Sequence, residues 1–396
     1  MRIAIAKPDV TSRNAPFQAE ADLWRFISEV FGCWVTVFSD LGLNYMDGRL
    51  RVKPLRRVSG TPWFPPYPGL LSGLRGFDVI VTADPSLYAY AYWAAMAALT
   101  WNARLVLDTS MTLLRPPYRG IGGHINLLLA KAAFGFSHRV IVPTALAAER
   151  LVKLGLVNSS TKIVELGHPA DTNLFRPDDD VPSEAGLFAA REGRRPGQGG
   201  YEVEGRRPGR AGYDRDGINI LSVGRLAFEK GHHVVVQALA EMLKFEGARL
   251  VIAGEGPYRQ PLMDLCRHLG VADRVSFLGL IPRDELPALY SRCDIFVQHP
   301  VTVDEWEESF GIAVVEAMAC GLPVVVSNCG ALEHVVPEDA GFLVGQQDKE
   351  ALREKVELLR DNPALRAEMG ARGRAHVCQR YSVQGVARRC YEEVLC

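Results

Sequence analysis

The regular alternation of short apolar strands with helical segments is the feature that most constrains the fold of this chain. In residues 2–165, runs rich in β-branched residues are separated by apolar-periodic segments such as Ala19–Phe31 and Ile125–Phe136. The expected strands of this half are Ile3–Ala6, Trp34–Phe38, Val79–Thr82, Arg104–Leu107, Val140–Val142 and Lys162–Glu165. Such alternation predicts βα units around a parallel sheet.

The same alternation resumes at Ile218. Its expected strands are Ile218–Val223, Arg249–Ile252, Val275–Phe277, Ile295–Val297, Val324–Val326 and Phe342–Val344, and helices are expected to begin near Gly231, Pro257, Arg283, Ile312, Lys349 and Ala364. A length of 396 residues suits two domains of ordinary size. We therefore predict an α/β protein of two doubly wound parallel-sheet domains, residues 1–177 and 217–381. A last helix within residues 382–396 is expected, and its packing back on the first domain is one alternative.

Residues 178–216, between the two domains, have a different composition. They are rich in Gly, Arg, Asp and Glu and contain a tandem repeat, Glu192–Tyr201 and Glu204–Tyr213. A segment with so few apolar residues buries too little surface to offset its ordering entropy, so we predict a disordered insertion or linker. An Arg-rich tether for phosphates or anionic lipid is the less favoured alternative, because the acids nearly balance the arginines.

Charge and cysteine usage exclude several classes of partner. With 45 basic and 46 acidic residues, the net charge of −1 gives no reason to expect nucleic acid. The eight cysteines form no CxxC pair and no cluster with His, so we expect reduced thiols, no metal site and a cytoplasmic protein. Met1–Ala6 is too short for a signal peptide and fits a first strand. Tyr88–Trp101 is predicted to be a buried helix, with a membrane-surface role as the alternative.

A basic pair follows the first strand of the second domain. Gly224 and Arg225 end that strand, and Lys230 lies in the loop before the next helix. Gly224 permits a tight exit from the strand. Arg offers a bidentate fork and Lys a point charge, a combination that suits a diphosphate. Taken alone, the pair is more typical of two solvated surface charges, and only the surrounding motifs favour a phosphate site.

Two glutamates bracket a helix start in Glu308-Ser-Phe-Gly-Ile-Ala-Val-Val-Glu316. Phe310-Gly311 is expected to place Glu308 on a loop and Glu316 about one turn into a helix that begins at Ile312. The N–H groups of that first turn favour a phosphate, while carboxylates accept hydrogen bonds from paired hydroxyls. Glu316 would then suit a ribose and Glu308 a hexose. The alternative is a capping and a surface glutamate, but a buried Glu316 needs a partner.

These motifs together resemble the retaining family-4 glycosyltransferases. The matching stretches are Gly224-Arg-Leu-x3-Lys230-Gly, Gly254-Glu-Gly-Pro, Phe277-Leu-Gly, Glu308-Ser-Phe-Gly-x4-Glu316-Ala-Met-Ala-Cys-Gly-Leu-Pro-Val and Gly330-x2-Glu333. Their order and spacing agree with the family throughout residues 218–345. Residues 166–177 resemble the family's interdomain segment, although Gly-His-Pro-Ala-Asp171 replaces its usual Asn-Gly-Val-Asp.

The resemblance implies a GT-B fold, in which two Rossmann-like domains face a cleft and the C-terminal domain holds a nucleoside diphosphate sugar. It implies that Lys230 and Arg225 contact the donor phosphates, Glu316 the ribose and Glu308 the sugar near the reacting carbon. The donor-binding residues expected on this basis are Gly224, Arg225, Lys230, Gly254, Phe310, Gly311, Ile312 and Glu316. Neither metal nor cofactor is expected, and the anomeric configuration would be retained by front-face attack.

The N-terminal domain departs from the family in two places. The loop after its first strand, Lys7–Pro16, lacks the family's glycines, and Asp108 stands where many members have a His after the fourth strand. An aspartate there can still accept a hydrogen bond from a sugar hydroxyl. His124 is the other candidate to complete the catalytic set with Glu308. The alternative for His124 is a helix-capping or packing role.

The sequence therefore predicts a retaining glycosyltransferase that moves a hexose to an acceptor hydroxyl of a glycan, lipid or small molecule. Another GT-B activity, such as a sugar-nucleotide epimerase or a phosphorylase, is one alternative, and a catalytically impaired donor-binding protein is another. A dinucleotide dehydrogenase is disfavoured because no Gly-x-Gly-x-x-Gly follows either first strand. The acceptor is not identified by the residues. Attachment to the inner face of a membrane stays an alternative, with the aromatic and proline loop Trp63–Pro68 as a candidate contact.

Overall fold

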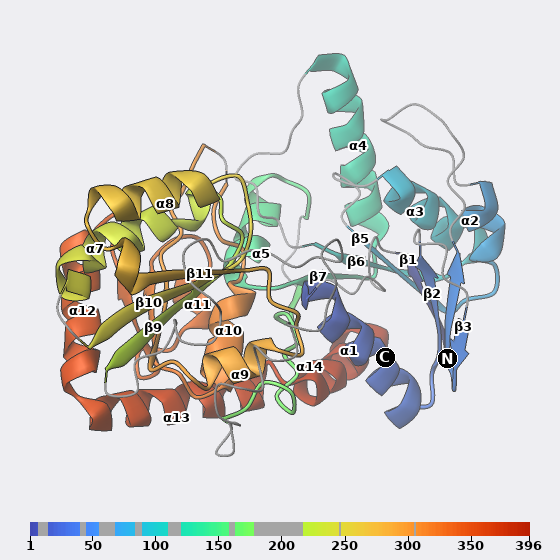
Figure 1. The fold of residues 1–396 in the computed structure, drawn as a ribbon. Coiled ribbons are helices and arrows are strands. Elements are labelled where there is room, and N and C mark those ends of the chain that lie inside the picture. The colour runs from blue at the N-terminus through green and yellow to red at the C-terminus, as the bar shows by residue number, and fades with distance from the viewer. Residues whose placement is uncertain are drawn as a thin grey trace, which may run out of the picture. The chain divides into compact units, whose positions relative to one another are not determined.

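A computed structural model describes residues 1–6, 15–39, 45–54, 68–83, 89–109, 120–157, 163–177, 217–244, 247–304 and 306–396. The chain divides into an N-terminal unit, Met1–Pro169 with Arg380–Cys396, and a C-terminal unit, Ala170–Gln379. Both are labelled by element in Figure 1. The predicted disordered segment 178–216, most of the Lys7–Pro16 loop and most of the Trp63–Pro68 loop lie outside the described residues.

The N-terminal unit is built on an eight-stranded sheet of order β3-β4-β2-β1-β5-β6-β7-β8. Its strands are β1 (Arg2–Ala6), β2 (Trp34–Ser39), β3 (Tyr45–Asp47), β4 (Leu50–Pro54), β5 (Val79–Ala83), β6 (Arg104–Asp108), β7 (Arg139–Val142) and β8 (Ile163–Glu165). Every neighbouring pair is parallel except β3–β4. The predicted parallel sheet is confirmed, but the short edge hairpin β3–β4 was not predicted.

Helices cover both faces of this sheet. They are α1 (Ala15–Val30), α2 (Pro68–Gly73), α3 (Ala89–Trp101), α4 (Gly120–Phe136), α5 (Ala145–Lys153), α14 (Val383–Arg389) and the π-helical turn η4 (Cys390–Leu395). Ile3 and Ile5 pack with α1, α14 and η4, whereas Ala4 and Ala6 pack with α2 to α5, as the period of a strand requires. Within the described residues, no helix combines the length and apolarity needed to cross a membrane.

The last residues of the chain belong to the N-terminal unit through hydrogen bonds as well as apolar contacts. The guanidinium of Arg389 donates to the carbonyl of Leu166 over 2.7 Å, and that of Arg104 donates to the carbonyl of Cys396 over 3.1 Å. Phe31 stacks on Tyr391 with ring centres 4.1 Å apart. The chain therefore returns to its first sheet after completing its second.

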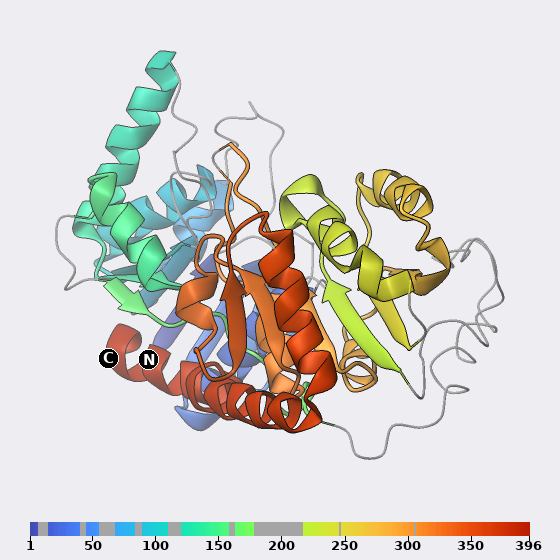
Figure 2. The same ribbon diagram turned by 90° about the vertical axis from the view of Figure 1, so that its left-hand side faces the viewer.

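The C-terminal unit has a six-stranded sheet of order β11-β10-β9-β12-β13-β14, parallel throughout. The strands are β9 (Ile218–Val223), β10 (Ala248–Ala253), β11 (Val275–Gly279), β12 (Ile295–Gln298), β13 (Val324–Ser327) and β14 (Gly341–Val344). The helices are η2 (Phe228–Lys230), α7 (His232–Lys244), α8 (Arg259–His268), η3 (Ala272–Arg274), α9 (Leu286–Tyr290), α10 (Ile312–Ala319), α11 (Leu332–Val335), α12 (Lys349–Asp361) and α13 (Pro363–Arg380). They lie on both faces of the sheet, as Figure 2 shows.

The strand order of this sheet reverses between β9 and its neighbour β12. Strands β10 and β11 lie on one side of β9, whereas β12, β13 and β14 follow on the other. At such a switch point the loops that leave the carboxyl ends diverge, and ligands of open α/β sheets bind in the crevice between them. The loops after β9 and β12 are therefore the place to look for a site.

Candidate functional site

The loop after β9 delivers Lys230 to the carboxyl edge of the sheet. Lys230 ends the short turn η2 (Phe228–Lys230). Gly231 follows with φ of +67°, and a Cβ at this position would lie 1.7 Å from the carbonyl oxygen of His299. Only glycine accepts both the left-handed backbone and this contact. The Lys230 turn is thereby packed directly against the segment that leaves β12.

The segment after β12 delivers Glu308 to the same place. The N–H of Val301 donates to the carbonyl of Glu229 over 2.9 Å, which joins the two loops through their backbones. Lys230 Nζ then lies 2.6 Å from Glu308 Oε2, with side-chain exposures of 19% and 9%. Water screens the attraction between these two largely buried charges less than it screens a surface pair. The switch point thus holds a largely buried Lys230–Glu308 ion pair.

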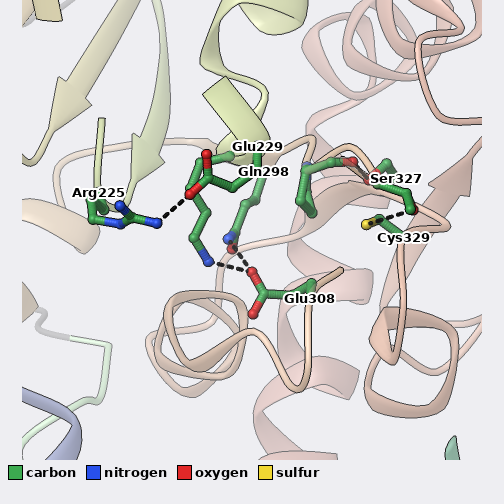
Figure 3. A network of polar contacts seen from close by, with 9 residues as sticks. Arg225, Glu229, Gln298, Glu308, Ser327 and Cys329 are labelled. Atoms are coloured by element: carbon green, nitrogen blue, oxygen red, sulfur yellow. Dashed lines mark hydrogen bonds and ion pairs between the residues drawn. The ribbon is translucent and has the colours of Figure 1, made fainter. Parts of the chain in front are cut away.

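Two further side chains contact the ion pair, and neither was indicated by the sequence. Gln298, the last residue of β12, places its Nε2 3.5 Å from Glu308 Oε2 and is 4% exposed. Figure 3 shows its amide directed at the Glu308 carboxylate. Trp306 places its ring centre 4.9 Å from Lys230 Nζ. Neither residue lies in a motif, so their position depends on tertiary contacts alone.

The turn after β13 fixes the backbone of Glu308. The N–H of Ala331 donates to the Glu308 carbonyl over 2.8 Å. Gly330 has φ of +62°, and a Cβ there would lie 2.1 Å from that carbonyl oxygen. The Gly330-x2-Glu333 motif therefore has a physical role in this chain: its glycine lets the turn approach the loop that carries Glu308.

Arg225 does not join the ion pair. Its guanidinium is paired with Glu229, four residues along the same loop, and its side chain is 58% exposed. Figure 3 shows the two side chains pointing toward each other. The expected basic pair is therefore split: Lys230 is buried against Glu308, whereas Arg225 lies at the surface with an acidic partner. Arg225 as a phosphate contact stays a prediction.

Helix α10 begins at Ile312, as predicted, and presents its N-terminus after the Glu308 loop. Gly311 is the N-cap residue of α10 and has the left-handed conformation. The preceding residue, Phe310, is buried, with an exposed fraction of 2%. The N–H groups of a first helical turn carry partial positive charge. The structure thus places Phe310, Gly311 and Ile312 on one continuous stretch with Glu308.

Gly224 and Gly254 lie side by side where β9 and β10 end. A Cβ on Gly254 would lie 1.8 Å from the carbonyl oxygen of Gly224. Behind them, His232 is 1% exposed, and its Nδ1 lies 3.0 Å from Ser222 Oγ. Burial and the nearby Lys230 charge lower the pKa of the His232 imidazole to about 4, so it is neutral at pH 7. Lys230 accordingly supplies positive charge here without help from this histidine.

Glu316 lies inside α10, one turn from its start, and is 6% exposed. Its partner is the hydroxyl of Tyr290, which donates to Oε2 over 3.3 Å from helix α9. Burial raises the pKa of the Glu316 carboxyl from 4.5 to about 7, against the opposing effects of Arg283 and of Tyr290. The predicted need for a partner is met within the protein, and a contact of Glu316 with a ribose stays a prediction.

The raised pKa of Glu316 makes a pH effect on stability measurable. The folded protein binds this proton more tightly than the unfolded chain, so the stabilisation is complete below about pH 4.5 and is lost as pH rises through about 7, a difference of about 3 kcal/mol. We expect the Tm of the wild type to fall more steeply between about pH 5 and about pH 8 than that of Glu316→Gln, which mimics the protonated acid.

The matched control for this comparison is Glu354→Gln, since Glu354 is an exposed glutamate on α12. Its pH profile should follow the wild type. Parallel Tm profiles for the wild type and Glu316→Gln would show that Glu316 does not bind a proton preferentially in the folded state.

Asp108 and His124 belong to the N-terminal unit. Asp108 ends β6 and is half-buried, while His124 lies on α4 and is exposed. Their role toward the donor stays a prediction. In the part of the chain that the structure describes, no group of His, Cys, Asp and Glu is arranged to hold a metal ion.

The C-terminal unit matches a known family model. Residues 210–376 match the model described as "Glycosyl transferases group 1". An uncharacterized glycosyltransferase of Methanocaldococcus jannaschii is 35% identical over 170 residues, which cover 43% of this chain and 42% of the relative. A GDP-mannose-dependent alpha-(1-6)-phosphatidylinositol monomannoside mannosyltransferase of Mycolicibacterium smegmatis is 35% identical over 159 residues, 39% of this chain and 42% of the relative. The matches to these relatives thus span less than half of their length.

Solved structures resemble the whole chain. HepE of Anabaena, in complex with UDP, has a TM-score of 0.74 at 19% identity and covers 100% of both chains. WaaG, a glycosyltransferase involved in lipopolysaccharide biosynthesis, has a TM-score of 0.64 at 15% identity and covers 98% of both chains. At this identity the likeness speaks for the fold alone, and it confirms the predicted GT-B fold class with its two parallel-sheet α/β units.

Proposed function

We propose that this chain, whose residues 210–376 belong to the glycosyl transferases group 1 family, is a retaining glycosyltransferase that uses a nucleoside diphosphate sugar. The observation that carries the proposal is the Lys230–Glu308 ion pair at the switch point of the C-terminal sheet. A cation, a carboxylate and a helix N-terminus then adjoin the crevice where a nucleotide binds in folds of this kind.

The side chains have distinct tasks in this reaction. As the bond between the anomeric carbon and the donor diphosphate breaks, negative charge develops on the leaving phosphate. Lys230 and the first turn of α10 would stabilise that charge, because they are already in place before it forms. Glu308 would accept hydrogen bonds from the sugar hydroxyls, and Glu316 from the ribose. The oxygen of the acceptor hydroxyl would attack from the face that the leaving group vacates and give its proton to the departing diphosphate, which retains the configuration.

A lipid-linked glycan is the acceptor class to test first. One relative is named for a phosphatidylinositol monomannoside acceptor and a structural neighbour for lipopolysaccharide biosynthesis. UDP sugars lead the donor list because the HepE complexes contain UDP or UDP-glucose, and GDP sugars follow because the mycobacterial relative is GDP-mannose-dependent.

Product analysis with and without acceptor tests the proposal. The expected result is release of nucleoside diphosphate that depends on the acceptor, together with a glycoside of the same anomeric configuration as the donor. A sugar nucleotide converted to its epimer, with no nucleoside diphosphate released, would replace the proposal by an epimerase. Inversion of the anomeric centre would contradict the proposed mechanism.

We expect transfer to proceed unchanged in EDTA. The Lys230 ammonium and the α10 N-terminus can together stabilise the leaving diphosphate without a divalent cation. The measurement is the initial rate of transfer in excess EDTA against the rate in Mg²⁺ or Mn²⁺. A loss of rate in EDTA that either cation restores would assign the charge stabilisation to a metal ion.

A further inference from the structure

The Lys230 ammonium has a second neighbour to which the proposed reaction gives no task. Its Nζ lies 4.9 Å from the ring centre of Trp306 while it is 2.6 Å from Glu308 Oε2. The Trp306 side chain is half-buried, and that of Lys230 is 19% exposed. A cation over an indole face is attracted by the ring's quadrupole, and more strongly where water is partly excluded.

Backbone hydrogen bonds hold the segment that carries this ring. The N–H of Trp306 donates to the carbonyl of Val303 over 2.8 Å, and the N–H of Val303 donates back over 3.1 Å, so the two residues form an isolated antiparallel bridge. The same loop is joined to the Lys230 turn by the hydrogen bond from Val301 to Glu229. The ring and the ammonium are thus carried by two segments that are bonded to each other without any ligand.

We propose that Trp306 is a positioning residue: it keeps the Lys230 ammonium in place while the ionic partner of that ammonium changes from Glu308 to the donor diphosphate. This inference rests on the proposed function, since it assumes that a diphosphate reaches Lys230. A carboxylate and a phosphate compete for the same ammonium, which has three N–H donors. The attraction to the ring face comes from the ring's quadrupole and does not depend on which anion pairs with the ammonium, so it persists while the anionic partner changes. Glu308 is thereby released to the sugar hydroxyls.

The first test is a double-mutant cycle on nucleotide affinity, measured calorimetrically with UDP and, separately, with GDP. Trp306→Leu should weaken binding about tenfold, whereas Trp306→Phe, which keeps an aromatic face, should weaken it less. In a Lys230→Met background, Trp306→Leu should have no further effect, because the ring acts through the ammonium. An equal loss in both backgrounds would overturn the inference.

Trp34 is the matched control on the other unit. It also lies under a cation, with the Arg49 guanidinium 5.9 Å from its ring centre, and it is 50% exposed. Trp34→Leu therefore removes a comparable contact far along the chain from Lys230. We expect it to leave the nucleotide affinity unchanged, and a loss as large as that of Trp306→Leu would show that the effect is not specific.

Fluorine NMR of the full chain labelled with fluorotryptophan reports on the change of ionic partner at Lys230 through the neighbouring Trp306 ring. Trp306→Phe assigns one resonance among the six tryptophans. Nucleotide should shift that resonance in the wild type and leave it in place in Lys230→Met. Nucleotide binding without any shift of the Trp306 resonance overturns this inference alone, whereas absence of binding by UDP and GDP overturns it together with the donor assignment.

Discussion

Replacement of Glu308 by Gln is expected to reduce sugar transfer by about a hundred- to a thousandfold while strengthening the binding of the free nucleoside diphosphate. Transfer falls because the carboxylate that holds the sugar is lost. Binding of the free nucleotide gains, because in the wild type the Glu308 carboxylate, 2.6 Å from Lys230 Nζ, already neutralises the ammonium that a phosphate would contact. Freed of that competition, the ammonium should bind UDP or GDP about five- to tenfold more tightly.

Opposite effects on turnover and nucleotide affinity are expected only if Glu308 contacts the sugar and competes with the phosphate for Lys230. A merely structural role of Glu308 would lower both. Steady-state kinetics with calorimetry of the same preparation gives both values. The matched control is Glu307→Gln, one residue earlier and half-buried, which should change neither by more than a few fold. Weaker nucleotide binding in Glu308→Gln would mean that Glu308 holds Lys230 in its working position instead of competing for it.

Replacement of Lys230 by Met is expected to weaken nucleotide binding about a hundredfold, which leaves the affinity measurable at raised nucleotide concentration, and to destabilise the fold. Glu308 is 7% exposed, so its charge would be left buried without a counter-ion. Breaking such a pair by removing one partner costs about 3 kcal/mol. Thermal or urea unfolding measures this, and the double variant Lys230→Met with Glu308→Gln should recover most of the loss, since no unpaired charge remains.

Lys244→Met is the control for the stability effect. Lys244 pairs with Glu241 at the same 2.6 Å separation, but the two side chains are 45% and 69% exposed. A surface pair of this kind contributes less than about 1 kcal/mol. If Lys244→Met and Lys230→Met destabilised the protein equally, the burial of the Lys230–Glu308 pair would have no energetic consequence.

The strands and the site loops were predictable because their signals are local. A run such as Ile218–Val223 fits the interior of a parallel sheet whatever surrounds it, and Gly311 before Ile312 indicates a helix start. Lys230 and Glu308 are 78 residues apart in sequence, yet both follow strands of one sheet. Because the carboxyl ends of parallel strands lie at one edge, their proximity followed from the topology.

The partners of these residues were not predictable, because they depend on tertiary contacts. Nothing in the sequence indicates that the Arg225 guanidinium pairs with Glu229. The Tyr290 hydroxyl reaches Glu316 from another helix, and Trp306, which lies outside every motif, contacts Lys230. The edge hairpin β3–β4 was missed for a different reason: β3 has only three residues, too few for a periodic pattern.

Whether the protein binds a nucleoside diphosphate through Lys230 is tested most directly by thermal unfolding of the full chain. The wild type and Lys230→Met are each measured with UDP, GDP and ADP. We expect at least one nucleotide to raise the stability of the wild type by about 2.7 kcal/mol at about 100 times its Kd, and the same nucleotide concentration to stabilise Lys230→Met by less than about 0.5 kcal/mol. No shift of the wild type with any of the three nucleotides, or an equally large shift in Lys230→Met, would contradict the role of Lys230 in binding the donor diphosphate.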